Sequence, residues 1–421
     1  MKKTKNIIKY LKNRDLLHGI TKQKELEKEF EKNKMHSIYC GFDTNDDSLH
    51  IGHLAILLIL RKFQKEGHKP IVLLGNATAI IGDPSFRKIK RNLEKLQNIK
   101  EFTKKIKLQI LRILNFKYGK NKAVIETNNS WFFSMKLIKF LKKVGNNFSI
   151  KNMIQKESIQ NRLKQKKKSC SFSEFTYSLM QSYDYLHLYK KHNVILQIGG
   201  SDQWGNIVSG IYLIKKTLNK KVYGITVQLV TDKKEKKFGK TEKNTIWLDK
   251  KKTSPYQFYQ FFINISDLKI KKFLRIFTSL SKKTIDLIMK NKKKAQKVLA
   301  EKITKKVHGS IGLSSAKKIS KILFLKEISK LKEKDFSFLL NNGIPNLLIK
   351  NFFDLQSILV ACKLSTSKRN SRELIRSNAI FINKKLNNKE DYIIDSKDFI
   401  YEKYILIRKG KKNYVLLFKK K

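Results

Sequence analysis

The feature of this sequence that most constrains its fold is a series of short apolar segments that end in glycine and lead into helical patterns. Strands that alternate with helices pair in parallel, because each helix carries the chain back along the sheet. The first 250 residues are therefore predicted to form an α/β domain around a parallel sheet. The strand segments are 37–42, 71–75 and 194–198, with a further strand at 226–230, and the helices that follow the first three are 54–64, 92–114 and one that begins near Asp202.

The rest of the chain predicts two further domains. Residues 254–340 show helical periodicity throughout, and turn-forming residues follow at 342–345. Beyond them the pattern is a helix and then short strands. A chain of 421 residues is also too long for one ordinary core. We expect an α/β domain over 1–252, an all-helical domain over 253–345 and a small α+β domain over 353–421. The strands predicted in the last domain are 380–382, 393–394, 404–407 and 415–418.

The charge balance is strongly basic, with 93 lysines and arginines against 34 aspartates and glutamates, a net charge of +59. Such a balance favours an acidic partner such as nucleic acid. Lysine is spread along the whole chain, however, and proline falls to 4 residues. This composition is typical of drift in an A/T-rich genome. Charge therefore does not locate a binding face, and a nucleic-acid function has to rest on motifs.

The cysteines and the apolar runs exclude several classes of protein. Cys40, Cys170 and Cys362 are widely spaced and form no CxxC pair, so neither a disulfide framework nor a zinc site is expected. The longest aliphatic run, 54–60, is far shorter than the roughly 20 residues that cross a bilayer. The N-terminus lacks an apolar signal core. We expect a cytoplasmic protein with no membrane span, no targeting peptide and no bound metal.

The clearest candidate site follows the first strand, where a polar loop leads through His50, Gly52 and His53 into a helix. Beyond a parallel strand, the N-terminus of a helix offers unpaired N–H groups to phosphate. The two imidazoles lie one turn apart and can face the same phosphates, while the glycine lets a flat ring approach the backbone. Two alternatives stay open: part of a metal site, and two histidines on a solvent-exposed helix surface.

Two later segments fit the same nucleotide. A double glycine, 199–200, ends the third strand and Asp202 opens the next helix, where an acidic residue suits sugar hydroxyls or simply caps the helix. Lys237, Lys240 and Thr241 lie in a lysine-rich loop further on. In a chain so rich in lysine, this loop is a weak signal by itself and gains weight only beside the other motifs.

A polar stripe on a predicted helix is a second candidate site. Tyr177, Gln181 and Asp184 are spaced i, i+4 and i+7 and share one helix face, which bulky apolar residues otherwise surround. Such a stripe lines a pocket or faces solvent. Exposed helix faces in this chain carry lysine, and this helix has none before Lys190. A pocket lining is therefore favoured.

Together these segments resemble the bacterial-type tyrosyl-tRNA synthetases, which are class I aminoacyl-tRNA synthetases. The motifs YCGFD, DSLHIGH, GDPS, LQIGGSDQWGN, KFGKT and KTSPYQFYQF occur in the family's order along nearly the whole chain. The resemblance implies a Rossmann-like catalytic domain over 1–252 with a connective insertion, a helical anticodon-side domain over 253–345 and an RNA-binding domain over 353–421. It also implies an ATP-dependent ligase that converts tyrosine and ATP into tyrosyl-adenylate and pyrophosphate, then transfers tyrosine to the 3′ end of tRNA(Tyr) in protein synthesis.

The resemblance also implies a role for each site residue. His50, His53, Lys237, Lys240 and Thr241 would act on the phosphates of ATP. Cys40, Gly52, Gly200, Asp202 and Lys240 would bind ATP, the first of these near the ribose that Gly200 and Asp202 hold. Tyr39 and Asp184 would receive the phenol of tyrosine, and Asp83, Tyr177 and Gln181 its ammonium group. Asp43 and Gln203 would lie beside the carboxylate and the α-phosphate.

The implied partners are tRNA(Tyr), L-tyrosine, ATP as substrate with Mg²⁺, and a second copy of the chain in a homodimer, with no tightly bound cofactor. The C-terminal segment resembles an RNA-binding fold shared with a ribosomal small-subunit protein. Arg369, Arg372 and Arg376 share one helix face there and are predicted to bind RNA. A solvated helix side is the alternative.

One position departs from the family pattern. Where the family usually reads Asp-Pro-Thr, this chain has Asp43, Thr44 and Asn45, so an amide replaces a hydroxyl near the departing pyrophosphate and a slower activation step is expected. Two other functions compete with the main one. A tryptophanyl-tRNA synthetase would need a different pocket from one with Tyr39 and Asp184, and a non-catalytic RNA-binding paralogue would be free to lose the nucleotide motifs.

Overall fold

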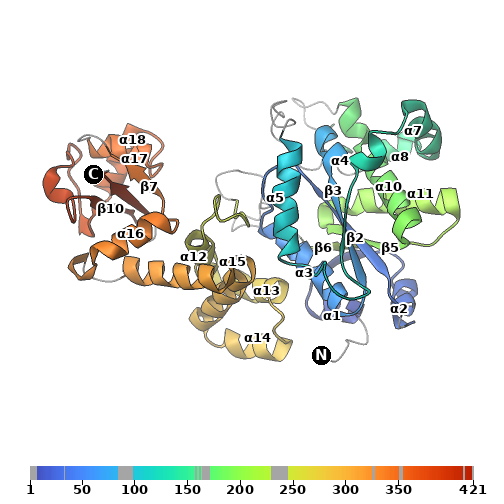
Figure 1. The fold of residues 1–421 in the computed structure, drawn as a ribbon, viewed down its shortest axis with the longest axis horizontal. Coiled ribbons are helices and arrows are strands. Elements are labelled where there is room, and N and C mark those ends of the chain that lie inside the picture. Colours follow the sequence, from blue (N-terminus) through green and yellow to red (C-terminus); the bar gives the residue numbers. More distant parts are fainter. Residues whose placement is uncertain are drawn as a thin grey trace. The chain divides into compact units, whose positions relative to one another are not determined.

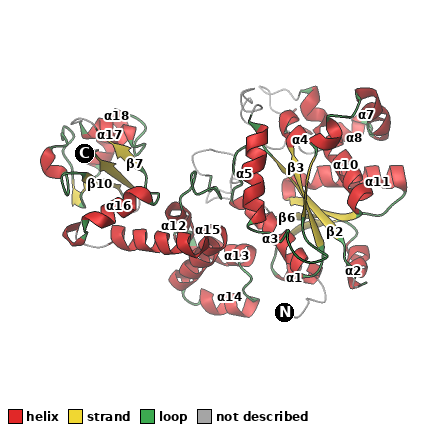
Figure 2. Ribbon diagram, viewed as in Figure 1, coloured by secondary structure: helices red, strands yellow, loops and turns green. Residues whose placement is uncertain are grey.

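A computed structural model of the chain describes residues 7–32, 34–83, 98–156, 159–160, 163, 171–228, 245–324, 328–349, 354–410 and 413–419. The chain divides into two compact units, Met1–Asp249 with Ile265–Leu299 and Lys250–Asn264 with Ala300–Lys421. Each unit has its own sheet, with helices around it (Figures 1 and 2). The three domain boundaries given above stay a prediction.

The sheet of the first unit contains, among the described residues, six strands in the order β1-β6-β5-β2-β3-β4. β1 pairs antiparallel with β6, and the other neighbouring pairs are parallel. The predicted α/β fold is therefore confirmed. The strand order reverses between β2 and β5, and open α/β sheets bind ligands beyond the carboxyl ends of the strands at such a point. The strands are β1 (Leu17–Ile20), β2 (Ser37–Asp43), β3 (Lys69–Gly75), β4 (Val124–Thr127), β5 (Val194–Gly200) and β6 (Tyr223–Val227).

Helices pack on both faces of this sheet. α3 follows β2 and contacts β2 and β3, whereas α10 and α11 pack against each other and against β5. α10 begins at a capping box of Ser171 and Glu174, which satisfies backbone N–H groups at the start of the helix. The helices of this unit are α1 (Ile7–Asn13), α2 (Gln23–Glu31), α3 (Ile51–Lys65), α4 (Asn76–Ile81), α5 (Ile99–Leu111), α6 (Asn129–Phe132), α7 (Leu137–Lys143), α8 (Ile150–Ile154), α10 (Phe172–His192), α11 (Trp204–Leu218), α13 (Asp267–Phe277) and α14 (Lys282–Met289).

Successive side chains of β2 point to opposite faces of the sheet. On one face, Tyr39 belongs to the buried cluster formed with α10, and its ring meets that of Tyr185 edge-on at 5.2 Å. On the other face, the ring of Phe42 lies 5.8 Å from that of His53 in α3, and Cys40 shares this face by the same alternation. The two faces come together where β2 ends.

The second unit combines helices with a sheet whose described strands have the order β7-β11-β10-β8-β9. α17 and α18 cover one face through a core that includes Ile375. On the other face Tyr404 stacks on Phe336 at 5.4 Å, and the Tyr414 hydroxyl donates to the Leu323 carbonyl at 3.3 Å. The unit contains α12 (Pro255–Ile263), α16 (Glu333–Asn341), α17 (Leu355–Ala361), α18 (Lys368–Arg376), β7 (Asn346–Leu348), β8 (Ile380–Ile382), β9 (Lys385–Leu386), β10 (Tyr404–Lys409) and β11 (Asn413–Phe418), and α15 (Lys292–Phe324) runs through both units.

The structure corrects the predicted strands in detail. The strand predicted at 393–394 is wrong: only Ile393 makes an isolated bridge, because Asp395 caps a short 3-10 turn immediately afterwards. The strand placed at 226–230 is β6, which begins three residues earlier at Tyr223. The helix predicted over 92–114 is α5, and residues 92–97 lie outside the described residues. Among the described helices, none is long and apolar enough to cross a membrane.

Candidate active site

A cavity of about 300 Å³ opens where β2, β3 and β5 end, at the reversal of strand order. It brings together all the predicted ATP and tyrosine residues that the structure describes. The predicted nucleotide residues in its lining are Cys40, His50, Gly52, His53, Gly200 and Asp202. The predicted tyrosine residues in its lining are Tyr39, Asp43, Asp83, Tyr177, Gln181, Asp184 and Gln203. Lys237, Lys240 and Thr241 lie outside the described residues.

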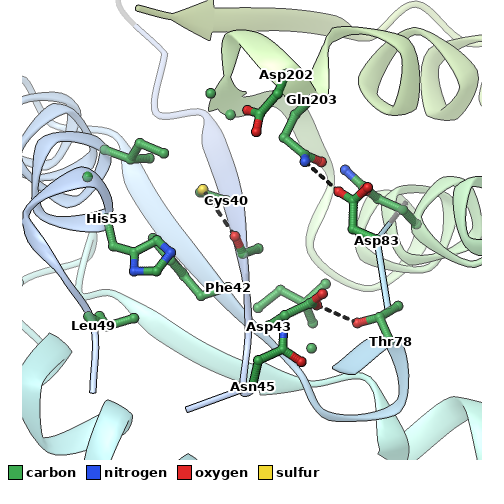
Figure 3. Close-up of a pocket in the computed structure, with 18 of the residues that line it drawn as sticks. Cys40, Phe42, Asp43, Asn45, Leu49, His53, Thr78, Asp83, Asp202 and Gln203 are labelled. Carbon is green, nitrogen blue, oxygen red and sulfur yellow. Dashed lines mark hydrogen bonds between the residues drawn. The ribbon is translucent and has the colours of Figure 1, made fainter. Parts of the chain in front are cut away.

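The alternation along β2 sorts the lining residues into two groups. His53, Cys40 and Phe42 lie on one side of the cavity, and Thr78 and Asp83 lie on the other (Figure 3). Asp43 stands at the end of the strand between the groups, with its carboxylate turned toward Thr78. A ligand in the cavity therefore meets imidazoles at one end and a set of carboxylates, amides and phenols at the other.

The two histidines form a stacked pair at the start of α3, with ring centroids 3.8 Å apart and 17° between the planes. The backbone N–H of Gly52 donates to Nδ1 of His50 at 3.1 Å, and the N–H of His50 donates to Nδ1 of His53 at 3.3 Å. A backbone N–H is always a donor, so both Nδ1 atoms accept. In the neutral ring the proton is then on Nε2. Each histidine thus offers one N–H donor.

Both imidazoles are held neutral by their surroundings. Burial lowers the pKa of His50 to about 4 and keeps the pKa of His53 well below its ordinary value; repulsion between the two rings, when His50 is protonated, lowers the pKa of His53 further. Both side chains are half-buried and line the cavity, so the alternative of two solvent-exposed histidines is wrong. Among the described residues, no group of three or more histidine, cysteine, aspartate or glutamate side chains is placed to hold a metal ion, so the alternative of a histidine metal site gains no support.

Gly52 is required by the histidine pair itself. A Cβ added at this position would stand 2.9 Å from Cε1 of His50, closer than carbon atoms normally approach. The imidazole could then no longer lie over the first turn of α3. The flat ring that requires a glycine here is therefore the imidazole of His50. The approach of a ring of the ligand to the same backbone stays a prediction.

The polar stripe on α10 points into the molecule. Tyr177 and Asp184 are only 5% and 2% exposed, so the alternative of a solvated face is wrong. The Tyr177 hydroxyl donates to Oδ2 of Asp43 at 3.0 Å, and Oδ1 of Asp43 accepts from the Thr78 hydroxyl at 2.8 Å. Nε2 of Gln203 donates to Oδ2 of Asp83 at 2.7 Å. These contacts fix the carboxylates at the end of the cavity away from the histidines.

Asp184 is held by two side chains that the sequence did not single out. Nε1 of Trp131 donates to its Oδ1 at 2.9 Å and Nδ2 of Asn128 donates to its Oδ2 at 3.3 Å. Burial raises the pKa of Asp184 well above its ordinary value, and these two donors oppose that rise. Trp131 in turn stacks on His187 at 4.2 Å. Both donors follow β4, a strand of only four half-buried residues that does not stand out in the sequence.

Buried polar atoms of the lining without a hydrogen-bond partner among the described residues include the hydroxyl of Tyr39, Oε1 of Gln181 and Oε1 of Gln197. A buried polar atom without a partner costs roughly 1–3 kcal/mol, so its partner is expected to be a ligand or water. Gln197 was not predicted, because an amide inside an apolar strand gives no periodic signal. Gly75 was not predicted either; a Cβ there would lie 2.3 Å from Oδ1 of Asp43.

Asp202 does not cap α11. The N-cap of that helix is Gln203, without a side-chain cap hydrogen bond, and Asp202 lies in the 3-10 turn Ser201–Gln203 before it. The reading of Asp202 as only a helix cap therefore finds no support. Its contact with a ribose stays a prediction.

The three arginines of α18 are all exposed on the second unit. Arg376 is paired with Glu390, and Arg369 lies 3.7 Å from Glu373. Arg372 has no carboxylate within ion-pair distance among the described residues. Of the predicted RNA-binding residues, Arg372 is therefore the one whose charge is least neutralised within the chain.

Comparison with known proteins agrees with this architecture. Residues 31–325 match the family described as tRNA synthetases class I (W and Y). Residues 336–417 match the tyrosine–tRNA ligase SYY-like C-terminal domain. The chain belongs to this family of class I synthetases, as the sequence predicted.

The full-length relatives are tyrosine–tRNA ligases. That of Blochmanniella floridana is 49% identical over 417 residues, and that of Pectobacterium atrosepticum is 43% identical over 418 residues, each with 98% of both chains covered. A solved C-terminally truncated mitochondrial tyrosyl-tRNA synthetase of Aspergillus nidulans has a TM-score of 0.67 at 28% identity, covering 77% of this chain and 95% of that one. The predicted activity, an ATP-dependent tyrosine–tRNA ligase, is confirmed, and neither alternative function is favoured.

The burial of the histidine pair predicts an unusual titration. Because the pKa of His50 is lowered to about 4, its ring should stay neutral from pH 8 down to about pH 5 and gain a proton only below that. The measurement is the Cε1–H chemical shift of His50 by NMR, assigned as the signal that His50→Asn removes. A shift change centred between pH 6 and 7 would contradict the buried, neutral pair.

Proposed function

We propose that the cavity positions tyrosine and ATP so that the tyrosine carboxylate attacks the α-phosphorus, giving tyrosyl-adenylate and pyrophosphate, before tyrosine passes to the 3′ end of tRNA(Tyr). The observation that carries this proposal is the sorting of the lining by β2. Imidazole donors suited to phosphate lie at one end, and the carboxylates, amides and phenols to which we assign tyrosine binding lie at the other. The carboxylate and the α-phosphate would then meet at Asp43 and Gln203.

The buried end suits a phenol. The Tyr39 hydroxyl has no partner among the described residues, and burial raises its pKa well above the ordinary value, so it stays a donor at neutral pH. Asp184 supplies acceptor oxygens nearby in the same lining. A tyrosine hydroxyl satisfies both groups, whereas phenylalanine leaves both buried and unpaired, which is costly. Trp131 and Asn128 keep the carboxylate of Asp184 in place.

The ammonium group of tyrosine would lie among Asp83, Tyr177 and the unpartnered Oε1 of Gln181. A cation is favoured there, because Tyr177 and Thr78 already donate to the neighbouring Asp43 and the remaining oxygens need donors. This arrangement sets the backbone end of the amino acid toward the carboxyl end of β2, where the nucleotide side begins.

The phosphates of ATP need positive charge that the described lining does not supply. Five aspartates line the cavity, and none of its described lining residues is a lysine or arginine. The histidines are neutral donors. We therefore assign the counter-charge to Lys237, Lys240 and Mg²⁺, with Thr241 beside them. Since no described cluster of ligands is placed for a metal, the ion would be held chiefly by phosphate oxygens, as Mg²⁺ prefers.

Catalysis would rest on position and electrostatics rather than on a general base. The tyrosine carboxylate is already ionised at neutral pH, so no proton has to be removed before attack. Fixed donors aimed at the growing phosphate charge stabilise the transition state, and removing one typically slows such a step by about a hundredfold. His50 and His53 each present Nε2–H for this purpose. Asn45, which lines the cavity beside Asp46, stays the expected cause of a slower step.

The test of this function is tyrosine-dependent exchange of labelled pyrophosphate into ATP, run with tyrosine, tryptophan and phenylalanine and without tRNA. Exchange with tyrosine alone is expected. Exchange with tryptophan instead would overturn the assignment of the phenol end. Failure with all three amino acids, from protein shown to be folded, would overturn the activation chemistry itself.

Asp184→Ala separates binding of the amino acid from binding of ATP. The variant removes the acceptor for the phenol, and a hydrogen bond to a charged group is worth about 1.5–3 kcal/mol. The KM for tyrosine in the exchange assay should therefore rise roughly tenfold to a hundredfold, while the KM for ATP stays within about twofold. Asp184→Asn keeps the shape of the side chain, and Asp286→Ala, on an exposed ion pair with Lys271, is the surface control. Equal losses for both substrates would indicate misfolding instead.

We propose that α18 contacts tRNA through Arg372. Arg372→Ala should weaken tRNA(Tyr) binding and lower by about one the slope of log affinity against log salt, because one phosphate contact is lost. Pyrophosphate exchange should not change. Lys397→Ala, an exposed cation of the same unit, is the control. An unchanged salt slope for Arg372→Ala would contradict this contact. Point variants are preferable to removing residues 353–421, which would uncover Phe336 and Leu323.

We further propose that the chain forms a homodimer through the apolar surface of α7 and α8. Phe133, Leu137, Ile138 and Ile150 are each at least 67% exposed, and contiguous exposed apolar surface typically marks an interface. Phe148 packs on Tyr212 of α11 at 5.8 Å, so the surface continues onto that helix. The proposed location is the cytoplasm, where translation uses the product.

Ile138→Lys should convert this dimer to a monomer, because it places a charge at the most exposed of these four apolar side chains. Light scattering of the purified protein measures the change, expected to be a halving of the molar mass. Leu268→Lys, at a leucine on α13 that is even more exposed and lies outside the surface, should leave the mass unaltered. A wild-type protein that is monomeric at micromolar concentration would overturn the proposal.

A further inference from the structure

The loop between β2 and α3, which orients His50 in the cavity, is held by a residue that does not line the cavity. Residues 45–48 between β2 and α3 form bends rather than regular structure, so their buried polar groups need partners elsewhere. Leu49 is only 1% exposed, yet its backbone N–H is satisfied: it donates to Oε1 of Gln109, on α5, at 2.9 Å. Figure 3 places Leu49 beside His53 at the edge of the cavity.

The amide of Gln109 also engages the residue before Leu49. Its Nε2 donates to the hydroxyl of Ser48 at 3.2 Å. Ser48 is only 3% exposed. Its hydroxyl accepts from the backbone N–H of Asp249 at 3.1 Å and donates to the Leu49 carbonyl at 2.9 Å. Ser48 and Gln109 therefore join three separate parts of the chain: the loop before α3, α5, and the segment 245–249.

The segment 245–249 completes this joint. Its Trp247 forms a bridge with His50 and lines the cavity. The N–H of Leu248 donates to the Leu49 carbonyl at 2.8 Å, and the N–H of Ile51 donates to the Ile246 carbonyl at 3.1 Å. The backbone on both sides of His50 is thus fixed by the segment, and the segment is fixed in turn through Ser48 and Gln109.

We propose that Gln109 is a positioning residue for the activation of tyrosine, which acts through Ser48 and Leu49 on the orientation of the His50 imidazole. Gln109 does not itself line the cavity within the described part of the chain. One turn earlier on α5, Lys105 also contacts Asp47 of the loop at 3.3 Å, but that ion pair is half-exposed and weak. The inference rests on the proposed function of the cavity, because the orientation of His50 affects the rate only if His50 acts on phosphate.

The effect should fall on the rate and not on tyrosine binding. A displacement of about 1 Å in a catalytic group can cost roughly a hundredfold in rate. Tyr39 and Asp184 belong to the opposite side of β2, and the hydrogen bonds of Asp184 within the described part of the chain go to Trp131 and Asn128 instead. Gln109→Met keeps the length of the side chain and removes both hydrogen bonds. The expected result is a tenfold to hundredfold lower kcat for pyrophosphate exchange, with the KM for tyrosine within about twofold.

The variant Gln109→Glu tests the role of the acceptor. It keeps an oxygen for the Leu49 N–H and loses only the donor to Ser48, so it should recover at least part of the lost rate. Lys107→Met, an exposed side chain on the same helix, is the matched control and should behave as wild type. Thermal unfolding of each variant accompanies the assay, so that a general loss of folded protein is recognised.

Two results would overturn the inference: wild-type kcat in Gln109→Met, or a KM for tyrosine that rises as much as kcat falls. A rate equally low in Gln109→Glu and Gln109→Met would also contradict a role through the Leu49 acceptor. These outcomes are distinct from failure of the proposed function. If the wild-type protein catalyses no tyrosine-dependent exchange, the cavity does not activate tyrosine and the inference falls with it.

Discussion

The pairing of β2 with β3 on one edge and with β5 on the other fixes almost everything about the site. It creates the reversal of strand order beyond which the cavity opens. Because side chains alternate along a strand, it also sends Tyr39 toward α10 and Cys40 toward α3. Two binding environments of different chemistry are therefore separated by the thickness of one strand, and they share only its carboxyl end, where Asp43 stands.

The environments differ in how they handle charge. Around Asp184 the carboxylate is buried and receives N–H donors from Trp131 and Asn128, so its acceptor oxygens are fixed before a ligand arrives. Burial disfavours the charged form at both sites, but Asp184 has donors that oppose this effect. At the start of α3, burial keeps His50 uncharged, and a backbone contact decides which nitrogen keeps its hydrogen. In both places burial and hydrogen bonds together fix the orientation of the side chain.

The sequence predicted the elements that carry a periodic or terminal signal. β2, β3 and β5 end in recognisable loops, and the i, i+4, i+7 spacing identified the α10 face. Contacts that join a side chain to distant backbone have no such signal. Gln109 reaches Leu49 from 60 residues away, and Trp131 follows a strand of four residues. The strand predicted at 393–394 failed for a related reason, because two isoleucines in a row look extended whether or not a neighbouring strand is there to pair with them. Individual residue roles, the domain boundaries and the lysine loop stay predictions.

The lysine-free lining of the cavity has a meaning beyond its electrostatics. Lysine and arginine make up 93 of the 421 residues of this chain, and lysine is spread along its whole length. The described lining of the cavity, with five aspartates and neither lysine nor arginine, departs from this composition. A biased composition hides binding faces on the outer surface of such a protein. Inside the protein, however, the positions that depart from the bias help to identify the pocket.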